Sequence, residues 1–375
     1  MKINKLFKLL IIFTIVIISC QDDNVDTPEI KEIIYTGDLI FKNQAEIDEF
    51  ILENENNVII EITGSLIVDS GLSDSNIYNI DTFRGLKKIG GNLKIINNSL
   101  LSSIETFENL NEVGGDLDIF DSGLLNLDGL INLNHIEGSL LIRHCSMGNI
   151  EGLKNLNHIG DDLYLILPNV ETLDCFTSVN STLSETVFLE MENLKNIDGL
   201  PNINSQLKIL IISQTSLSSL QSSLSNIKTV GRLELVNNDN LLDLNVFENI
   251  ELVEGDFSLR GNDKIGNLNG FSNLIEIGGD LDIFGNINLQ EITSLTNLKK
   301  VGQYIYIKYN DELKSLEGLN NIEPKQRRIE LIDNYKLDDF CSLNNQYNSG
   351  LVFFDIRGNL YNPNPSDFSD GNCKI

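Results

Sequence analysis

The heptapeptide Gly-Gly-Asp-Leu-Asp-Ile-Phe stands at residues 114–120 and again at residues 278–284. Its Leu-x-Ile pair alternates apolar and polar residues, as a strand with one buried face does. Aligned on the first apolar residue of this pair, the chain repeats about every 24 residues, which is typical of a solenoid. We place this anchor position at Leu66, Leu93, Leu117, Leu140, Leu163, Val187, Leu207, Leu233, Phe257, Leu281, Ile305, Ile329 and Phe354.

The rest of each repeat has a different spacing. After the Leu-x-Ile pair the apolar residues recur every third position, as in tight 3₁₀ or polyproline-like turns. An asparagine recurs five residues after the anchor, where its amide can both donate to and accept from buried backbone groups of neighbouring turns. These asparagines are Asn98, Asn238, Asn262, Asn286, Asn310, Asn334 and Asn359. The pattern predicts one short strand per turn, stacked in parallel on its neighbours.

The pattern Leu-x-Ile-x-x-Asn followed by spaced leucines resembles a leucine-rich repeat. The longer phrases GLKNLNHIGDDLYL from Gly152 and GFSNLIEIGGDLDI from Gly270 resemble the receptor L-domain repeats of Bacteroidetes surface lipoproteins. The segments TGDLIFKNQAEIDEF and GNLYNPNPSDFSDGNC resemble the opening and closing caps of that family, so that the likeness spans roughly residues 36–375. It implies a mainly β, leucine-rich-repeat-like right-handed solenoid of about 13 turns of roughly 24 residues, capped at both ends. It implies no ligand, because binding specificity varies within the family.

The first residues are predicted to be a targeting segment rather than part of the fold. Basic residues precede an apolar run at residues 9–18, which is too short to span a bilayer comfortably. The segment ends Ile-Ile-Ser-Cys, and this resembles a bacterial lipoprotein signal with Cys20 as the lipidated residue. An ordinary secretory signal with a chance cysteine is the alternative.

An acidic stretch follows Cys20, with five carboxylates and one lysine over residues 20–32. Such a stretch stays solvated and serves as a tether. It also resembles the surface-export signal of Bacteroidetes lipoproteins, so we predict a cell-envelope, outer-membrane lipoprotein exposed at the surface; a periplasmic spacer is the alternative. The predicted divisions are a signal peptide at 1–19, a tether at 20–36, an N-terminal cap at 37–65, repeats at 66–340 and a C-terminal cap at 341–375.

The cysteines are predicted to play structural roles. Cys341 and Cys373 bracket the closing cap, and in an exported protein we expect them to pair. The closed loop would stabilise the fold by roughly 3–4 kcal/mol. Cys145, at an asparagine position of the repeat, and Cys175 are predicted to be buried free thiols, with a disulfide between them as the alternative.

The sequence favours neither an enzyme nor a cofactor or metal protein. It lacks the usual catalytic, phosphate-binding and dinucleotide-binding motifs. His135 and His158 occupy the same repeat position with His144 nearby, but we find no carboxylate at ligand spacing and predict no metal site. Glu330 and Asp355 would be neighbours that a glycosidase could use, although the turns are too uniform to build a cleft.

The best candidate for a ligand surface is the outward face of the predicted sheet. Its ends are polar, whereas its middle is apolar or aromatic, and contiguous apolar surface marks interaction sites. The same turns break the repeat, since Pro168 stands at an asparagine position. The predicted contact residues are Leu141, Arg143, Tyr164, Ile166, Phe188 and Leu210. A second candidate is the aromatic group Phe284, Tyr306 and Tyr309.

These observations predict a non-enzymatic surface protein that presents a solenoid sheet to an extracellular protein or glycan, as an adhesin or a receptor-like protein does. Contact with the membrane would be through the lipid alone, and the net charge of −28 argues against nucleic acid as a partner. The alternatives are a structural spacer of the cell envelope and a polysaccharide-cleaving enzyme on a solenoid.

Overall fold

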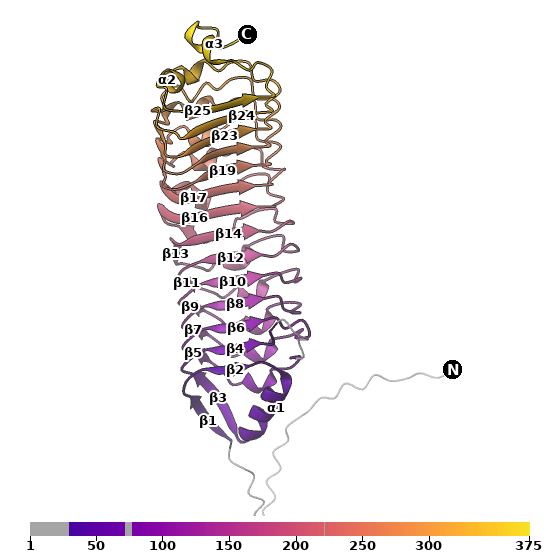
Figure 1. Ribbon diagram of the computed structural model, residues 1–375. Coiled ribbons are helices and arrows are strands. Elements are labelled where there is room, and N and C mark those ends of the chain that lie inside the picture. The colour runs from indigo at the N-terminus through magenta and orange to yellow at the C-terminus, as the bar shows by residue number, and fades with distance from the viewer. Residues whose placement is uncertain (1–29, 72–76, 221) are drawn as a thin grey trace, which may run out of the picture.

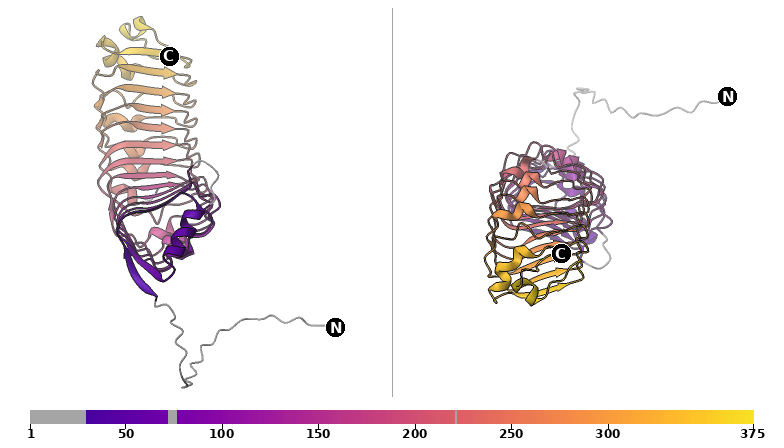
Figure 2. Two further views of the ribbon diagram at one scale, coloured as in Figure 1. Left: turned by 60° about the horizontal axis from the view of Figure 1, so that its bottom comes forward. Right: turned by 90° about the horizontal axis from the view of Figure 1, so that it is seen from above.

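The computed structural model describes residues 30–71, 77–220 and 222–375, which wind into one elongated stack of parallel strands (Figure 1). The predicted signal peptide and Cys20 lie outside the described residues. Each turn adds one strand to a main sheet, and the two ends of the described chain lie at opposite ends of the stack (Figure 2). The strands of the main sheet are β2 (Leu39–Phe41), β4 (Leu66–Asp69), β6 (Leu93–Ile96), β8 (Leu117–Phe120), β10 (Leu140–Arg143), β12 (Leu163–Ile166), β14 (Thr186–Glu190), β16 (Gln206–Ser213), β17 (Thr229–Val236), β19 (Phe257–Arg260), β21 (Leu281–Phe284), β23 (Tyr304–Lys308), β24 (Arg328–Ile332) and β25 (Phe353–Arg357).

A lateral set of short parallel strands precedes the main strands in the chain. The strands from β1 to β11 pair in chain order, and β13 pairs with β15 alone. The strands β18, β20 and β22 pair in order, beginning with β18 on the first residues of β17. The lateral strands are β1 (Lys31–Tyr35), β3 (Asn57–Ile62), β5 (Lys88–Ile89), β7 (Glu112–Val113), β9 (His135–Ile136), β11 (His158–Ile159), β13 (Thr182–Leu183), β15 (Asn202–Ile203), β18 (Leu252–Val253), β20 (Glu276–Ile277) and β22 (Lys300–Val301).

The three-residue spacing produces short 3₁₀ turns, as the sequence predicts, and these stack on one another opposite the strands. They are η1 (Asp81–Phe83), η2 (Glu105–Phe107), η3 (Asp128–Leu130), η4 (Glu151–Leu153), η5 (Asp174–Phe176), η6 (Ser222–Asn226), η7 (Asn245–Phe247), η8 (Asn269–Phe271), η9 (Thr293–Asn297) and η10 (Cys341–Leu343). One continuous apolar core lies between the strands and these turns.

The predicted anchor residues pair with one another from turn to turn, except in β16. There Leu210 pairs with Val187 and Leu233, whereas the predicted anchor Leu207 pairs with Val230 of the lateral set. The prediction is wrong because β16 and β17 are long strands that take part in both sheets. Both Leu207 and Leu210 of β16 therefore fit the anchor pattern. With Leu210 as the anchor, the main sheet keeps its regular register throughout.

The repeated asparagines form a buried ladder that links the turns. Asn262, Asn286 and Asn310 are inaccessible to solvent, and each accepts a hydrogen bond from the backbone N–H of the preceding ladder asparagine at 3.0–3.2 Å. Each side-chain amide in turn donates to a backbone carbonyl of the preceding turn, as Asn286 Nδ2 does to the Leu259 oxygen at 2.9 Å. Asn362 ends the ladder, because its oxygen accepts from the N–H of Asn359 at 3.1 Å.

Two turns in the middle of the stack depart from this ladder. In the other regular turns a residue with positive φ, such as His144 or Gln214, precedes the ladder position. Within the described residues, the turns after β12 and β14 contain no residue with positive φ, and buried Leu167 and Met191 follow the strands directly. The prediction that Pro168 takes the ladder position is therefore wrong, since Leu167 fills it.

The N-terminal cap begins earlier than predicted. Residues Lys31–Tyr35, assigned to the tether, form β1 and pair with β3, while β2 pairs with β4 and so adds a strand to the main sheet. Helix α1 (Gln44–Glu53) covers the end of the core with Ile47 and Phe50. No helix of the described ranges has the length and apolar character that crossing a membrane requires.

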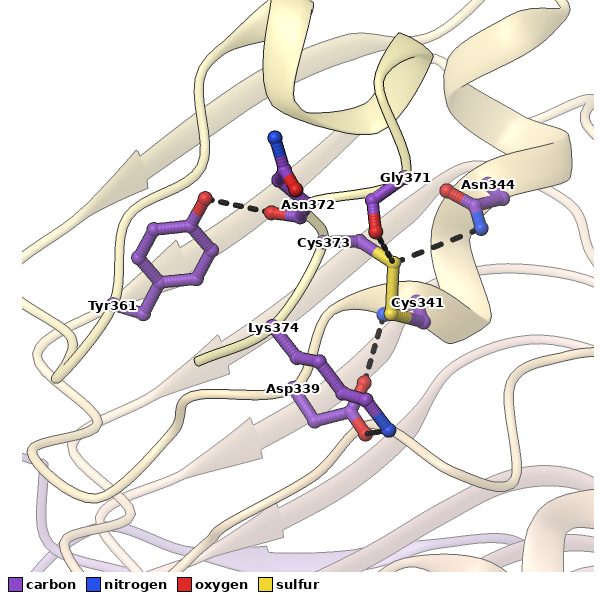
Figure 3. Close-up of a disulfide and its surroundings, with 8 residues drawn as sticks. All are labelled: Asp339, Cys341, Asn344, Tyr361, Gly371, Asn372, Cys373 and Lys374. Carbon is purple, nitrogen blue, oxygen red and sulfur yellow. Dashed lines mark hydrogen bonds and ion pairs between the residues drawn. A yellow bond between two sulfur atoms is a disulfide. The ribbon is translucent and has the colours of Figure 1, made fainter.

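The C-terminal cap contains helices α2 (Asn344–Asn348) and α3 (Pro365–Ser369). Cys341 and Cys373 form a disulfide, as the sequence predicts, and the Phe340 N–H donates to the Cys373 oxygen at 2.9 Å. Nearby the Tyr361 hydroxyl donates to the Asn372 carbonyl at 2.7 Å (Figure 3). The disulfide and these hydrogen bonds hold the last residues across the end of the stack, where the core would otherwise meet water.

Candidate ligand-binding surface

The outward face of the main sheet carries two columns of side chains. The anchors point into the core. The residues one and three positions after each anchor therefore point outward. In-register parallel pairing places equivalent residues of successive turns side by side. Figure 1 looks onto this sheet.

Four consecutive turns place apolar side chains in the first column, and we call Leu141, Tyr164, Phe188 and Ile211 the central patch. Each pairs with the next across β10, β12, β14 and β16. The rings of Tyr164 and Phe188 stack with their centroids 4.1 Å apart and their planes at 7°. All four side chains are partly exposed, and they form a flat apolar strip between Asp118 and Glu234 of the same column.

One predicted contact residue does not belong to this surface. Leu210 is fully buried as the anchor of β16, and Ile211 occupies the outward position in its place. The error follows from the wrong anchor in that turn, since Leu207 and Leu210 are three residues apart and a shift by an odd number of residues exchanges the inward and outward faces of a strand. The other predicted residues, Leu141, Arg143, Tyr164, Ile166 and Phe188, lie on the outward face.

Arg143 is held beside the central patch. Its guanidinium lies 5.2 Å from the ring centre of Phe120 and 5.7 Å from that of Tyr164, and it binds Asp118 at 2.8 Å. Asp118 itself is 6% exposed. Contacts on three sides limit the conformations of this arginine, so little side-chain entropy remains to be lost on binding a partner. Arginine and tyrosine are among the residues that contribute most to protein interfaces.

A hollow of about 360 Å³ lies beside the central patch, over the two turns that depart from the ladder. Those turns lack the positive-φ residue of their neighbours, and His144 and Gln214, which have positive φ, lie on either side of them. The hollow is lined by His144, Cys145, Ser146, Ile166, Pro168, Glu190, Glu192 and Gln214. The irregular turns thus shape the surface next to the aromatic stack.

A second depression, of about 480 Å³, lies on the same sheet between β17 and β23. Two of the predicted aromatic residues, Phe284 and Tyr306, line it, while Tyr309 packs edge to face on Phe284 with the ring centres 5.1 Å apart. Arg260 and Lys308 also line it, as does the carboxylate of Asp282. Sequence analysis missed these charged residues, although they occupy the same two outward columns.

The charged groups of this depression are paired and partly desolvated. Arg260 binds Asp282, Lys308 binds Glu330, and the Lys308 ammonium lies 4.8 Å from the ring centre of Tyr306. Burial raises the pKa of Asp282, an effect that Arg260 opposes. Burial likewise raises the pKa of the Tyr306 hydroxyl. Planar polar groups beside aromatic faces suit a saccharide. Its hydroxyls can bind the polar groups, and its apolar faces can lie on the aromatic rings.

The carboxylates that a glycosidase could use are part of an ion-pair network. Glu330 binds Lys308 and Arg328, while Asp355 binds Arg328 and Arg357, each at 3.2 Å. Basic side chains therefore contact the oxygens of both carboxylates. The arrangement does not favour the enzymatic alternative.

The two remaining cysteines are structural. Cys145 and Cys175 are 1% and 2% exposed and form no disulfide. Burial raises the pKa of the Cys175 thiol far above its ordinary value. The Cys145 thiol donates to the Arg143 carbonyl at 3.4 Å, as an asparagine amide does at the same position in other turns.

Comparisons with known proteins give similarity of structure alone. No protein-family model matches the sequence, and no curated protein is significantly similar to it. An internalin of Listeria monocytogenes is 16% identical, with a TM-score of 0.40 and coverage of 84% of this chain and 89% of its own. A leucine-rich-repeat protein of Leptospira interrogans is also 16% identical, with a TM-score of 0.42 and coverage of 86% and 82%. One from Bacteroides eggerthii is 12% identical, with a TM-score of 0.29 and coverage of 81% and 71%.

The fold is a leucine-rich-repeat solenoid. The asparagine ladder, the parallel main sheet and the stacked 3₁₀ turns of this chain establish it.

Proposed function

We propose that this protein is a non-enzymatic, lipid-anchored cell-surface protein, adhesin-like or receptor-like, that binds an extracellular macromolecule through its main sheet. The observation that carries the proposal is the central patch, Leu141, Tyr164, Phe188 and Ile211, with Arg143 beside it. Contiguous outward apolar surface on an otherwise charged protein is costly in water and marks an interaction site.

A protein is the partner that best fits the central patch. The patch is a flat strip rather than a pocket, and an aromatic stack with a positioned arginine has the composition of an interface centre. The turns of the central patch are joined by in-register parallel pairing of their main strands, so we expect recognition by a preformed surface with little rearrangement. The depression at Phe284 and Tyr306 supports a glycan as the second candidate ligand.

Loss of the central patch should abolish partner binding and leave the fold intact. The variant Tyr164→Ala, Phe188→Ala, Ile211→Ser in residues 21–375 removes partly exposed side chains that the core does not use. We expect its affinity for the partner to fall by more than about 30-fold, since a single residue at an interface centre contributes about 2 kcal/mol or more. Binding to arrays of extracellular proteins and glycans measures the effect, and circular dichroism checks the fold.

A matched control removes apolar side chains elsewhere. Leu100, Leu125 and Leu242 are 57%, 69% and 59% exposed and lie after the strands, away from the central patch. Changing all three to serine should leave binding unchanged. Equal binding by both variants would move the site to the Phe284 depression, and absence of binding by the parent protein would favour the spacer of the cell envelope.

Anchoring through Cys20 is a separate prediction. Cells that express the full chain should incorporate labelled palmitate into it, and Cys20→Ser should abolish the label and release the protein from the membrane fraction. A diacylglyceryl cysteine carries several acyl chains, which suffices for stable anchoring where one chain does not. Protease added to intact cells then tests surface exposure. Membrane retention of the Cys20→Ser variant would contradict lipidation and favour an uncleaved apolar segment.

A further inference from the structure

A cluster of three potential metal ligands lies on the lateral strands, outside the surface described above. His135 of β9 and His158 of β11 are paired residues of adjacent turns, and their rings stack with centroids 4.3 Å apart and planes at 8°. Glu137 follows in the same turn as His135, and its Oε2 lies 2.8 Å from His135 Nε2. The expectation that no carboxylate stands near these histidines at ligand spacing is therefore wrong.

We propose that His135, Glu137 and His158 bind one divalent transition-metal ion of the zinc class. One ligand atom from each residue lies within 4.8 Å of the other two. Two imidazoles and one carboxylate with an open fourth position are a donor set that zinc accepts, whereas magnesium and calcium prefer oxygen ligands.

The geometry requires only side-chain movement to close around an ion. Ligand atoms on one tetrahedral zinc lie about 3–3.5 Å apart, so the His135–Glu137 pair is already near that spacing. The stacked rings must tilt toward each other, because lone pairs in parallel planes do not converge. His135 has a 37% exposed side chain, which leaves room for this rotation.

The position of the cluster in the lateral sheet also favours metal binding. β11 is the last strand of its six-stranded ladder, so within the described residues His158 has no partner strand on its far side. The nearest cation of the same column, Lys88, is held by Glu112 at 2.8 Å.

Zinc titration of residues 21–375 in chelator-treated buffer tests the proposal, since these residues contain the whole described fold. We expect one equivalent of zinc by calorimetry, with binding weakened at least about tenfold by each of His135→Asn, Glu137→Gln and His158→Asn. Millimolar magnesium should not compete. Glu276→Gln is the matched control, because Glu276 lies on lateral strand β20 and pairs with Lys300 as Glu112 pairs with Lys88.

A second measurement separates a defined site from diffuse binding to acidic surface. The chain has three histidines, so their ring protons can be assigned by NMR from the variants. Zinc should shift the resonances of His135 and His158 together and leave His144 unchanged. Failure to bind zinc, several equivalents that survive all three variants, or a shift of His135 without His158 would each overturn the three-ligand site. Circular dichroism confirms that the exposed substitutions leave the fold unchanged.

Discussion

Asn286→Leu should lower the free energy of unfolding by about 3 kcal/mol, although leucine is apolar and of similar size. The substitution removes the acceptor of the Asn262 N–H and the donor to the Leu259 carbonyl, at 3.0 and 2.9 Å. A buried N–H without a partner costs about 1–3 kcal/mol, and the lost amide hydrogen bond about 1 more. Urea unfolding followed by circular dichroism measures the difference.

Asn288→Leu is the matched control for this experiment. Asn288 lies two residues further on and is exposed, and its amide donates to the Asp263 carbonyl at 2.7 Å. Water replaces that hydrogen bond when the amide is lost, so we expect a change within about 0.5 kcal/mol. Equal losses for the two variants would mean that the buried ladder contributes no more than a surface contact.

Gly270→Ala should lower the free energy of unfolding by about 3 kcal/mol, as much as Asn286→Leu, because of a steric clash. An added Cβ at Gly270 would lie 1.7 Å from the carbonyl oxygen of Leu244 in the preceding turn. The neighbouring atoms are backbone, so the two turns must move apart, and overpacking of this kind costs about 1–3 kcal/mol or more. Gly129, Gly152 and Gly199 approach the preceding turn in the same way, at 1.8–1.9 Å.

Gly266→Ala provides the control, since a Cβ at that position meets no atom within 4 Å. The substitution should be neutral or stabilise the protein by about 0.4–1 kcal/mol, because alanine restricts the unfolded chain. The same urea unfolding experiment compares the two alanine variants. If Gly270→Ala also left stability unchanged, the spacing between turns would have to be more adaptable than the ladder suggests.

The expected effects of Asn286→Leu and Gly270→Ala matter for the proposed function because they concern the rigidity of the stacked turns. The central patch consists of side chains from four turns, and their relative positions depend on the distance and register between those turns. A preformed patch binds without the entropic cost of ordering it. A ladder variant far from the patch should therefore change stability more than it changes affinity.

Much of the candidate surface could be predicted from the sequence. Leu141, Tyr164 and Phe188 were placed on the outward face because a strand alternates with period two and the anchors on either side are unambiguous. The sequence misplaces Leu210 because β16 contains two Leu-x-Ile pairs, one beginning at Leu207 and one at Leu210, and the pairing with β14 selects the second. The short turn at Leu167 was missed because proline at an expected asparagine position looks like a substitution rather than a deletion.

The proximity of Glu137 to the two histidines could have been predicted from the sequence. His135 and Glu137 are two residues apart in an extended segment, so the same alternation that assigns the main sheet places them on one side. The neighbouring turn then supplies His158. The charged lining of the second depression was missed for a related reason, since Arg260 and Asp282 come from different turns.

The repeat, all but one of the buried anchors and the asparagine ladder follow from the sequence, because each depends on spacing along the chain. The pairing of Cys341 with Cys373 follows from their places on either side of the closing cap of an exported protein. The tertiary structure alone decided which strand joined which sheet, and hence that Leu210 is buried and Lys31–Tyr35 belongs to the fold. It also decided which side chains of different turns meet. Spacing is a local property of the chain, whereas register between turns is set by backbone hydrogen bonds and packing that no single repeat contains.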